Sequence, residues 1–224
     1  MNRISDPGPE ATFRSAEHAV FSNAKNYRRD PHVPLLVPFV NPSHLSIVQQ
    51  QRALHSPPLK KGFIVTNANC STTGYVISLS ALEKTFGPLV IVTTMQAISG
   101  AGYSGIPSLD ILNNVVPFIS GEEEKIEWET LKILGGITED DEGVKVFDMH
   151  ARHPLRVSAS CSRVPVIDGH TECVSVRFSR RPPSPQQVRE ALAAYSPDAQ
   201  SLGCPSAPRH TIIVHEQPDR PQPR

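Results

Sequence analysis

The order of apolar and polar positions predicts alternating strands and helices in the first third of the chain. The apolar run V-P-L-L-V-P-F-V at 33–40 has the length of a buried strand, and its prolines keep the backbone extended. A helix is predicted at 41–52, with Asn41 or Ser43 as its cap, and G-F-I-V-T at 62–66 is a second short strand. Strand, helix and strand at this spacing predict a parallel α/β unit.

The rest of the chain has the pattern of an α+β domain. Apolar residues at helical spacing predict a helix over 72–87, ended by Gly87. A helix at 184–195 is predicted from Ser184 as cap and Pro185 at the first helical position. The other predicted elements are strands at 89–99, 144–150, 155–166 and 170–178 and a helix with an acidic first turn at 121–135.

The dipeptide Asp168-Gly169 separates two of these strands and predicts a two-residue hairpin. In that register Arg163 faces Val174, and Arg163 projects from the same side of the sheet as His170. The two would lie roughly 13 Å apart, at about 3.3 Å per residue. This pairing predicts a largely antiparallel sheet in the second domain.

Composition narrows the classes of partner. Among 224 residues, 22 Lys and Arg balance 22 Asp and Glu, so no basic surface favours nucleic acid or a charged membrane. No stretch approaches the roughly 18 apolar residues of a membrane span, and the first residues lack the apolar core of a signal peptide. We therefore expect a cytoplasmic protein. Its four cysteines form no C-x-x-C pair, so we expect free thiols and no metal site.

Cys70, in T-N-A-N-C-S-T-T, has two interpretations. If a helix begins at Ser71 or Thr72, its positive end favours the thiolate and lowers the thiol pKa, and neighbours such as Asn69 offer donors to an oxyanion. Alternatively, the cysteine is a small packing residue at a strand–helix junction. A nucleophilic thiolate needs an acid/base partner, and His170 is the candidate. A solvated histidine in a hairpin is the alternative for that residue.

The run G-A-G-Y-S-G at 100–105 matches the dinucleotide-binding pattern G-x-G-x-x-G after a strand. Pro107 and N-N-V-V-P break the helix that should follow. We therefore expect a tight glycine turn beside an active site and no dinucleotide site there.

Several longer motifs then carry a family resemblance. They are N-C-S-T-T-G, T-T-M-Q-A-I-S-G-A-G-Y, D-I-L-N-N-V-V-P-F-I-S-G-E-E-E-K-I-E, S-C-S-R-V-P-V-I-D-G-H-T-E and L-G-C-P-S-A-P. In this order they resemble aspartate-semialdehyde dehydrogenases, from about Glu17 to Gln222. The resemblance implies NADP- and phosphate-dependent interconversion of aspartate semialdehyde and aspartyl phosphate, in the biosynthesis of lysine, threonine and methionine. It also implies a homodimer or homotetramer.

The resemblance assigns roles to individual residues. Cys70 corresponds to the nucleophile, His170 to the acid/base, and Gln96 to a glutamine that positions the acyl intermediate. The residues implied in substrate and phosphate binding are Arg163 for the carboxylate, Glu122 for the amine, and Lys125 and Arg28 for phosphate.

The resemblance also implies the organisation of domains. Residues 1–69 are expected to be a remnant of a Rossmann-like nucleotide-binding domain, 70–216 a catalytic and dimerisation domain, and 217–224 a proline-rich tail. The family's glycine-rich NADP-binding unit and its C-terminal helix have no counterpart here, so the main cofactor-binding residues are unknown. Two alternatives stay open: a non-catalytic paralogue acting as a dimerisation or regulatory module, and a cofactor-free Cys/His thioesterase or hydrolase.

Overall fold

The computed structural model describes residues 8–83, 86–150 and 155–223. Their contacts divide the chain into two compact units. The first unit comprises Met1–Ala68 and Lys132–Arg152, and the second comprises Asn69–Leu131 and His153–Arg224. Residues 132–152 thus group with the first unit, whereas the sequence predicts them to belong to the second domain.

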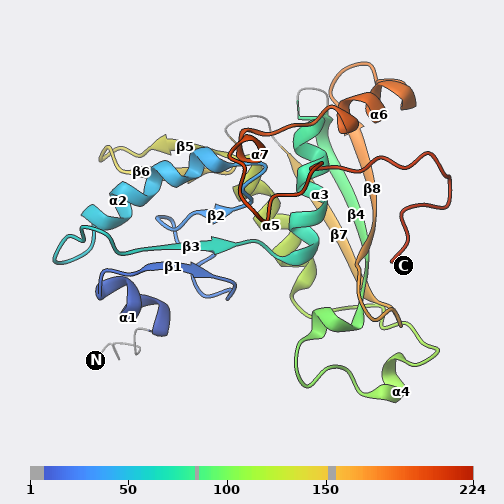
Figure 1. Ribbon diagram of the computed structural model, residues 1–224, viewed down its shortest axis with the longest axis horizontal. Coiled ribbons are helices and arrows are strands. Elements are labelled where there is room, and N and C mark those ends of the chain that lie inside the picture. Colours follow the sequence, from blue (N-terminus) through green and yellow to red (C-terminus); the bar gives the residue numbers. More distant parts are fainter. Residues whose placement is uncertain (1–7, 84–85, 151–154, 224) are drawn as a thin grey trace. The chain divides into compact units, whose positions relative to one another are not determined.

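The first unit contains a three-stranded parallel sheet (Figure 1). Strand β3 (Phe63–Asn67) lies between β1 (Ala19–Ser22) and β2 (Leu35–Leu36), and both neighbours run parallel to it. The predicted parallel unit is therefore present. The predicted strand at 33–40 is reduced to two residues, because Pro34 and Pro38 have no amide hydrogen to continue a ladder.

The helix predicted at 41–52 is a 3₁₀ turn (Pro42–Ile47) followed by α2 (Val48–Ala53). Asn41 precedes the turn but does not cap it. Its side chain accepts from Val37 N and donates to the carbonyl of Leu35, so it closes the loop after β2. The first unit also includes α1 (Pro9–Ser15) and the antiparallel pair β5 (Gly136–Glu139) and β6 (Lys145–Asp148).

The second unit is built on a mixed sheet in the order β7-β4-β8. Strand β4 (Phe86–Gln96) pairs in parallel with β7 (Arg156–Arg163) and antiparallel with β8 (Thr171–Phe178). The predicted hairpin is therefore wrong, and so is the largely antiparallel sheet. The segment after β7 bonds to the end of β4 instead, through Val164 N to the Gln96 carbonyl. Because β4 takes the central position, β7 and β8 are not neighbours.

The two faces of this sheet differ. On β4, Val90, Val92, Thr94 and Gln96 are buried, whereas Ile91 and Thr93 on the opposite face are exposed. Helix α3 (Cys70–Ala81) packs against β4 and β8. The predicted continuation of this helix to Gly87 is wrong, because β4 begins at Phe86 and includes Gly87.

Helix α5 (Glu122–Leu134) has the acidic first turn that the sequence predicts. Its Glu123 and Glu127 carboxylates accept from the backbone amides of Cys161 and Ala159, each at 3.1 Å. These amides belong to the outer edge of β7. The carboxylates therefore occupy an edge that would otherwise be open to another strand.

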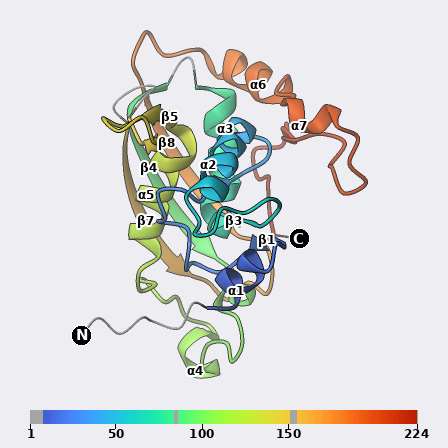
Figure 2. The same ribbon diagram turned by 90° about the vertical axis from the view of Figure 1, so that its left-hand side faces the viewer.

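After β4 the chain makes a long excursion that carries a 3₁₀ turn (Ile98–Ala101) and the short α4 (Ser108–Ile111), and it projects beyond the end of the sheet (Figures 1 and 2). Helix α6 (Pro185–Ala193) begins with the predicted Ser184 cap, in a capping box with Gln187. The short α7 (Asp198–Ser201) follows. Among the helices in the described ranges, none has the length and apolar character to cross a membrane.

Candidate active site

Cys70 is the first residue of α3, one position earlier than the predicted helix start. Asn69 is the cap: its Oδ1 accepts from Ser71 N at 3.0 Å and from Thr72 N at 3.3 Å. The Asn69 amide donates to Glu129 Oε2, and its Nδ2 donates to Glu122 Oε2, each at 2.6 Å. The side chain predicted to donate to an oxyanion is thus engaged in holding the cysteine turn.

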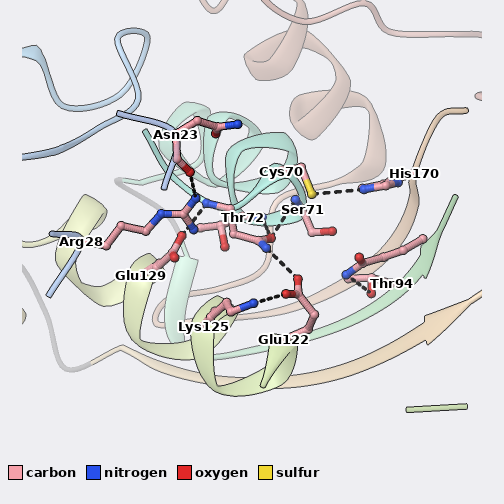
Figure 3. A network of polar contacts seen from close by, with 12 residues as sticks. Asn23, Arg28, Cys70, Ser71, Thr72, Thr94, Glu122, Lys125, Glu129 and His170 are labelled. Atoms are coloured by element: carbon pink, nitrogen blue, oxygen red, sulfur yellow. Dashed lines mark hydrogen bonds and ion pairs between the residues drawn. The ribbon is translucent and has the colours of Figure 1, made fainter. Parts of the chain in front are cut away.

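His170 lies against the cysteine (Figure 3). Its Nε2 is 3.2 Å from Cys70 Sγ, and its Nδ1 accepts the backbone N–H of Ala97 at 3.0 Å. An amide nitrogen can only donate, so Nδ1 carries no proton in this arrangement. We therefore assign the neutral tautomer with hydrogen on Nε2, directed at the sulfur.

The electrostatic surroundings differ from the prediction. Burial raises the pKa of the Cys70 thiol, the N–H of Ser71 opposes this, and the carboxylates of Glu122 and Glu172 raise the pKa further. The predicted lowering by the helix end is therefore outweighed. Burial lowers the pKa of His170, and the Arg163 cation lowers it more than Glu122 raises it. Both shifts favour a neutral thiol–imidazole pair at rest.

The side chains of Arg163 and His170 both bond to the backbone of Ala97. Arg163 Nη1 donates to the Ala97 carbonyl at 2.6 Å, so the two polar groups of one residue hold both side chains. A Cβ on Gly100 would lie 3.0 Å from Arg163 Nη1 and 2.9 Å from His170 Cε1. Arg163 and His170 thus approach one another through a different strand pairing. The predicted separation of roughly 13 Å is wrong, because both side chains reach the same position beside Gly100. The glycine turn 98–101 packs directly on both side chains, as expected of a turn beside an active site.

Glu122 and Lys125 extend this group of residues (Figure 3), and Gln96 lies at the end of β4. Burial by itself would raise the pKa of Glu122, but hydrogen bonds from Lys125 and Asn69 and a smaller one from Gln96 hold it below its ordinary value. Glu122 pairs with Lys125 through its other oxygen, Oε1. Gln96 is buried and donates to Thr94 Oγ1 at 3.4 Å. The charged Glu122 can therefore receive an ammonium group at neutral pH.

Arg28 belongs to the first unit. It is 8% exposed, and its Nη2 donates to the Asn23 carbonyl at 3.0 Å. The other seven predicted residues belong to the second unit: Asn69, Cys70, Gln96, Glu122, Lys125, Arg163 and His170.

Sequence reasoning missed three contributors to this site. The Ala97 peptide has no side-chain signature, and Gly100 was noted only as part of a turn. Glu172 could have been found, because it follows His170 by two residues on a strand and so shares its face. Within the described residues, no group of three His, Cys, Asp or Glu side chains could hold a metal ion.

Comparison with known proteins identifies the family of this chain. The family described as semialdehyde dehydrogenase, dimerisation domain, matches residues 79–224. An aspartate-semialdehyde dehydrogenase of Cryptococcus neoformans is 66% identical and one of Schizosaccharomyces pombe 54% identical, each over 96% of this chain. The chain spans 58% and 59% of the lengths of these two relatives.

Solved structures give the same result. The aspartate-semialdehyde dehydrogenase of Candida albicans, determined with NADP, superposes with a TM-score of 0.82 at 51% identity, over 96% of this chain and 59% of that one. The Vibrio cholerae aspartate-semialdehyde dehydrogenase II, determined with ASA, superposes with a TM-score of 0.63 at 28% identity, over 82% of this chain and 55% of that one.

This chain belongs to the semialdehyde dehydrogenase dimerisation-domain family. The two relatives from Cryptococcus neoformans and Schizosaccharomyces pombe are both named aspartate-semialdehyde dehydrogenases.

Proposed function

We propose that this chain carries the catalytic residues of an aspartate-semialdehyde dehydrogenase. The reaction is the NADP- and phosphate-dependent interconversion of aspartate semialdehyde and aspartyl phosphate through a thioester on Cys70. The observation that carries the proposal is the placement of Cys70 Sγ at the start of α3, 3.2 Å from His170 Nε2. The named activity of its relatives supports the choice of substrate.

The residues of the second unit explain how the substrate is bound and attacked. Arg163 binds the carboxylate with the part of its guanidinium not committed to Ala97, and Glu122 binds the amine. The sulfur of Cys70 attacks the aldehyde carbon. The Nε2–H of His170 then donates to the oxygen on which negative charge develops. Its predicted acid/base role remains a prediction.

Phosphate completes the cycle by attacking the thioester carbon and releasing Cys70. Lys125 and Arg28 are the proposed phosphate ligands. Lys125 already pairs with Glu122, so its ammonium is held at the site before phosphate binds. Gln96, buried beside Thr94, positions the acyl carbonyl.

The hydride acceptor of the proposed reaction would be NADP, with which the Candida albicans structure was determined. The described residues provide only part of a dinucleotide site. The carboxyl end of the parallel sheet, in the proposed Rossmann-like remnant, borders a cavity of about 330 Å³ lined by Phe21, Leu36 and Asn67 among others. The glycine-containing segment 100–105 lies between β4 and α4, but α4 has only four residues, so we assign no pyrophosphate-binding residues there.

Self-association through the second unit is the other part of the proposal, as a homodimer or homotetramer. The exposed face of β7-β4-β8 presents small side chains such as Thr93, Ser160 and Cys173 beside Ile91. The family description names a dimerisation domain over residues 79–224, which supports self-association through this unit. Thr93→Arg should shift the chain toward the monomer in light scattering, whereas Thr138→Arg on β5 should not.

The reverse half-reaction tests Cys70 without any cofactor. Aspartyl phosphate should acylate Cys70 and release phosphate, and intact mass with peptide mapping should locate the thioester on that residue. Cys70→Ala should carry no acyl group, and Cys204→Ala, at another exposed free cysteine, should behave as wild type. Equal acylation of wild type and Cys70→Ala would refute the proposal. A thioester that hydrolyses rapidly without phosphate would favour the cofactor-free hydrolase.

A further inference from the structure

A cavity of about 930 Å³ lies between α3, β8 and α6 in the second unit. Cavities of roughly 300–1,000 Å³ commonly hold small organic ligands. Away from the start of α3 its walls are apolar and include Leu79, Val176 and Leu192. Helix α3 rises by about 7.5 Å from Gly74 to Leu79. The apolar part of the cavity can therefore cover an extended hexyl chain.

Glu172 provides the charge in this cavity. Its carboxyl group, on β8, reaches α3 so closely that a Cβ on Gly74 would lie 3.3 Å from Glu172 Oε2. Among the described residues that line the cavity, Glu172 is the one carboxylate, and none is a lysine or an arginine. Glu172 also forms no ion pair with another residue in the described part of the chain. A negative group in partly apolar surroundings thus lacks a cation to balance it.

The pKa of Glu172 is consistent with a missing cation. Burial raises this pKa to about 7, and the nearby Ser71 hydroxyl opposes the rise. An ammonium group at hydrogen-bond distance would favour the ionised carboxyl group and lower its pKa again. A ligand that carries such a group would therefore stabilise the charged form of Glu172.

The two parts of the cavity together select one class of ligand. An anion would be repelled by the Glu172 carboxylate, and an uncharged apolar molecule would leave that carboxylate buried and unpaired. The proposed substrate is short and charged at both ends, so it has no apolar part for Val176 and Leu192. A protonated amine with an aliphatic chain satisfies both the carboxylate and the apolar walls.

From this arrangement we infer that the cavity binds a protonated aliphatic amine, with its ammonium group on Glu172 and its chain against Leu79, Val176 and Leu192. The ammonium hydrogens donate to the carboxylate oxygens in a charge-assisted hydrogen bond. The chain leaves water as it enters the apolar part, which supplies the rest of the affinity.

This site differs from the proposed position of the substrate amine. That amine is assigned to Glu122, whose carboxylate is already engaged by Lys125 and by Asn69 Nδ2. The inference goes beyond the proposed reaction and does not require Cys70 to be the nucleophile. Because Cys70 lines the same cavity, an amine bound there would occupy space beside the thiol.

A titration with hexylamine, followed by NMR of the leucine and valine methyl groups, tests the inference. The methyl signals of Leu79, Val176 and Leu192 should shift and saturate. Hexanol has the same chain without the charge and should bind at least about tenfold more weakly. Each methylene added from butylamine to hexylamine should raise the affinity about threefold.

Glu172→Gln separates the charge from the shape of the cavity. It should bind hexylamine at least about tenfold more weakly than wild type and bind hexanol equally well. Glu142→Gln, at an exposed position, is the matched control and should bind both compounds like wild type.

The pH dependence gives an independent measurement on the wild-type protein. Affinity for hexylamine should rise between about pH 6.5 and pH 8, because Glu172 becomes charged through its pKa of about 7, and affinity for hexanol should not. His170, whose pKa is lowered from 6.5, is uncharged over this range, and Glu122, whose pKa is lowered from 4.5, is ionised throughout. Raised pKa values keep three further neighbours uncharged: Cys70, Tyr75 and Cys161.

Several results would overturn the inference. They are unchanged hexylamine affinity in folded Glu172→Gln, hexanol binding as tight as hexylamine binding, and methyl shifts that do not include Val176 and Leu192. If Glu172→Gln does not fold, a wild-type affinity for hexylamine that stays constant from pH 6.5 to 8 overturns it. None of these results bears on the proposed nucleophile, which the acylation by aspartyl phosphate tests separately.

Discussion

Two polar clusters in this protein differ in how completely their donors and acceptors are paired. In the first unit Lys132 is 2% exposed, and its Nζ donates to the carbonyls of Arg28, Asp30 and Val33 at 2.7, 2.9 and 3.0 Å. All three ammonium hydrogens are used. In the second unit the cluster around Cys70 includes the Ser71 hydroxyl without a hydrogen bond of normal geometry and the Glu172 carboxyl group without an ion pair.

The difference distinguishes polar groups that stabilise the fold from polar groups that are available for chemistry. A saturated cluster stabilises one backbone conformation, here the loop 28–33, and has no capacity left for a ligand. An incompletely paired cluster lowers stability but keeps groups ready to bind or to exchange protons. Substitutions in the first cluster should therefore change unfolding, and substitutions in the second should change reactivity.

The largest effect is expected from Lys132→Met. The substitution leaves three buried carbonyls without donors, so the free energy of unfolding should fall by about 3 kcal/mol in urea titrations. Lys60→Met, at an exposed position, should change it by no more than about 0.5 kcal/mol. Slower reaction of Cys70 in folded Lys132→Met would contradict the assignment of stability to the first cluster and reactivity to the second.

A smaller effect, and on reactivity alone, is expected from Gly100→Ala. The new Cβ would press on His170 Cε1 and Arg163 Nη1, both near the ends of side chains that can shift. Unfolding should change little, while acylation of Cys70 by aspartyl phosphate should slow by about tenfold to a hundredfold. Ser99→Ala in the same turn is the control. A strongly destabilised Gly100→Ala protein would contradict this view of the turn.

The smallest effect concerns an exposed carboxylate in the first unit. Glu17 accepts the backbone amides of Lys60, Lys61 and Gly62, which lower its pKa to about 2. Because the folded pKa lies below the unfolded value of 4.5, its stabilisation is present above pH 4.5 and is lost as the pH falls toward 2.

Glu17→Gln should therefore unfold more readily at neutral pH and show a weaker loss of stability over this acidic range, measured by urea midpoints at each pH. Glu139→Gln on β5 is the control and should keep the wild-type pH dependence. Identical acid profiles for Glu17→Gln and wild type would show that the three amides do not depend on the charge.

Local signals in the sequence predicted several elements well. The acidic first turn and apolar spacing of α5, and the Ser184 cap and Pro185 of α6, act between residues three or four apart, so they can be recognised along the chain. The Asp168-Gly169 dipeptide predicted the wrong strand pairing, because pairing depends on residues that are distant in the sequence. Gly169 does adopt a positive φ of 89°, but the strands on either side pair with β4, far away in the sequence.

The candidate site shows the same division. Motif order alone brought Cys70, His170, Arg163, Gln96 and Glu122 together as candidates. The tautomer of His170 depends on the amide of Ala97, and the pKa of Cys70 on burial and on two carboxylates from other elements. Neither the tautomer of His170 nor the pKa of Cys70 can be recognised from a short stretch of sequence.

The sequence by itself predicted which side chains are candidates for chemistry and that the cysteine lies at the start of a helix, because helix signals are local. Only the tertiary structure decided that β4 lies between β7 and β8, that Ala97 holds both His170 and Arg163, and that Glu172 faces Gly74. Strand order, burial and electrostatic fields depend on residues distant in the sequence. Their energies exist only once the sheet has formed.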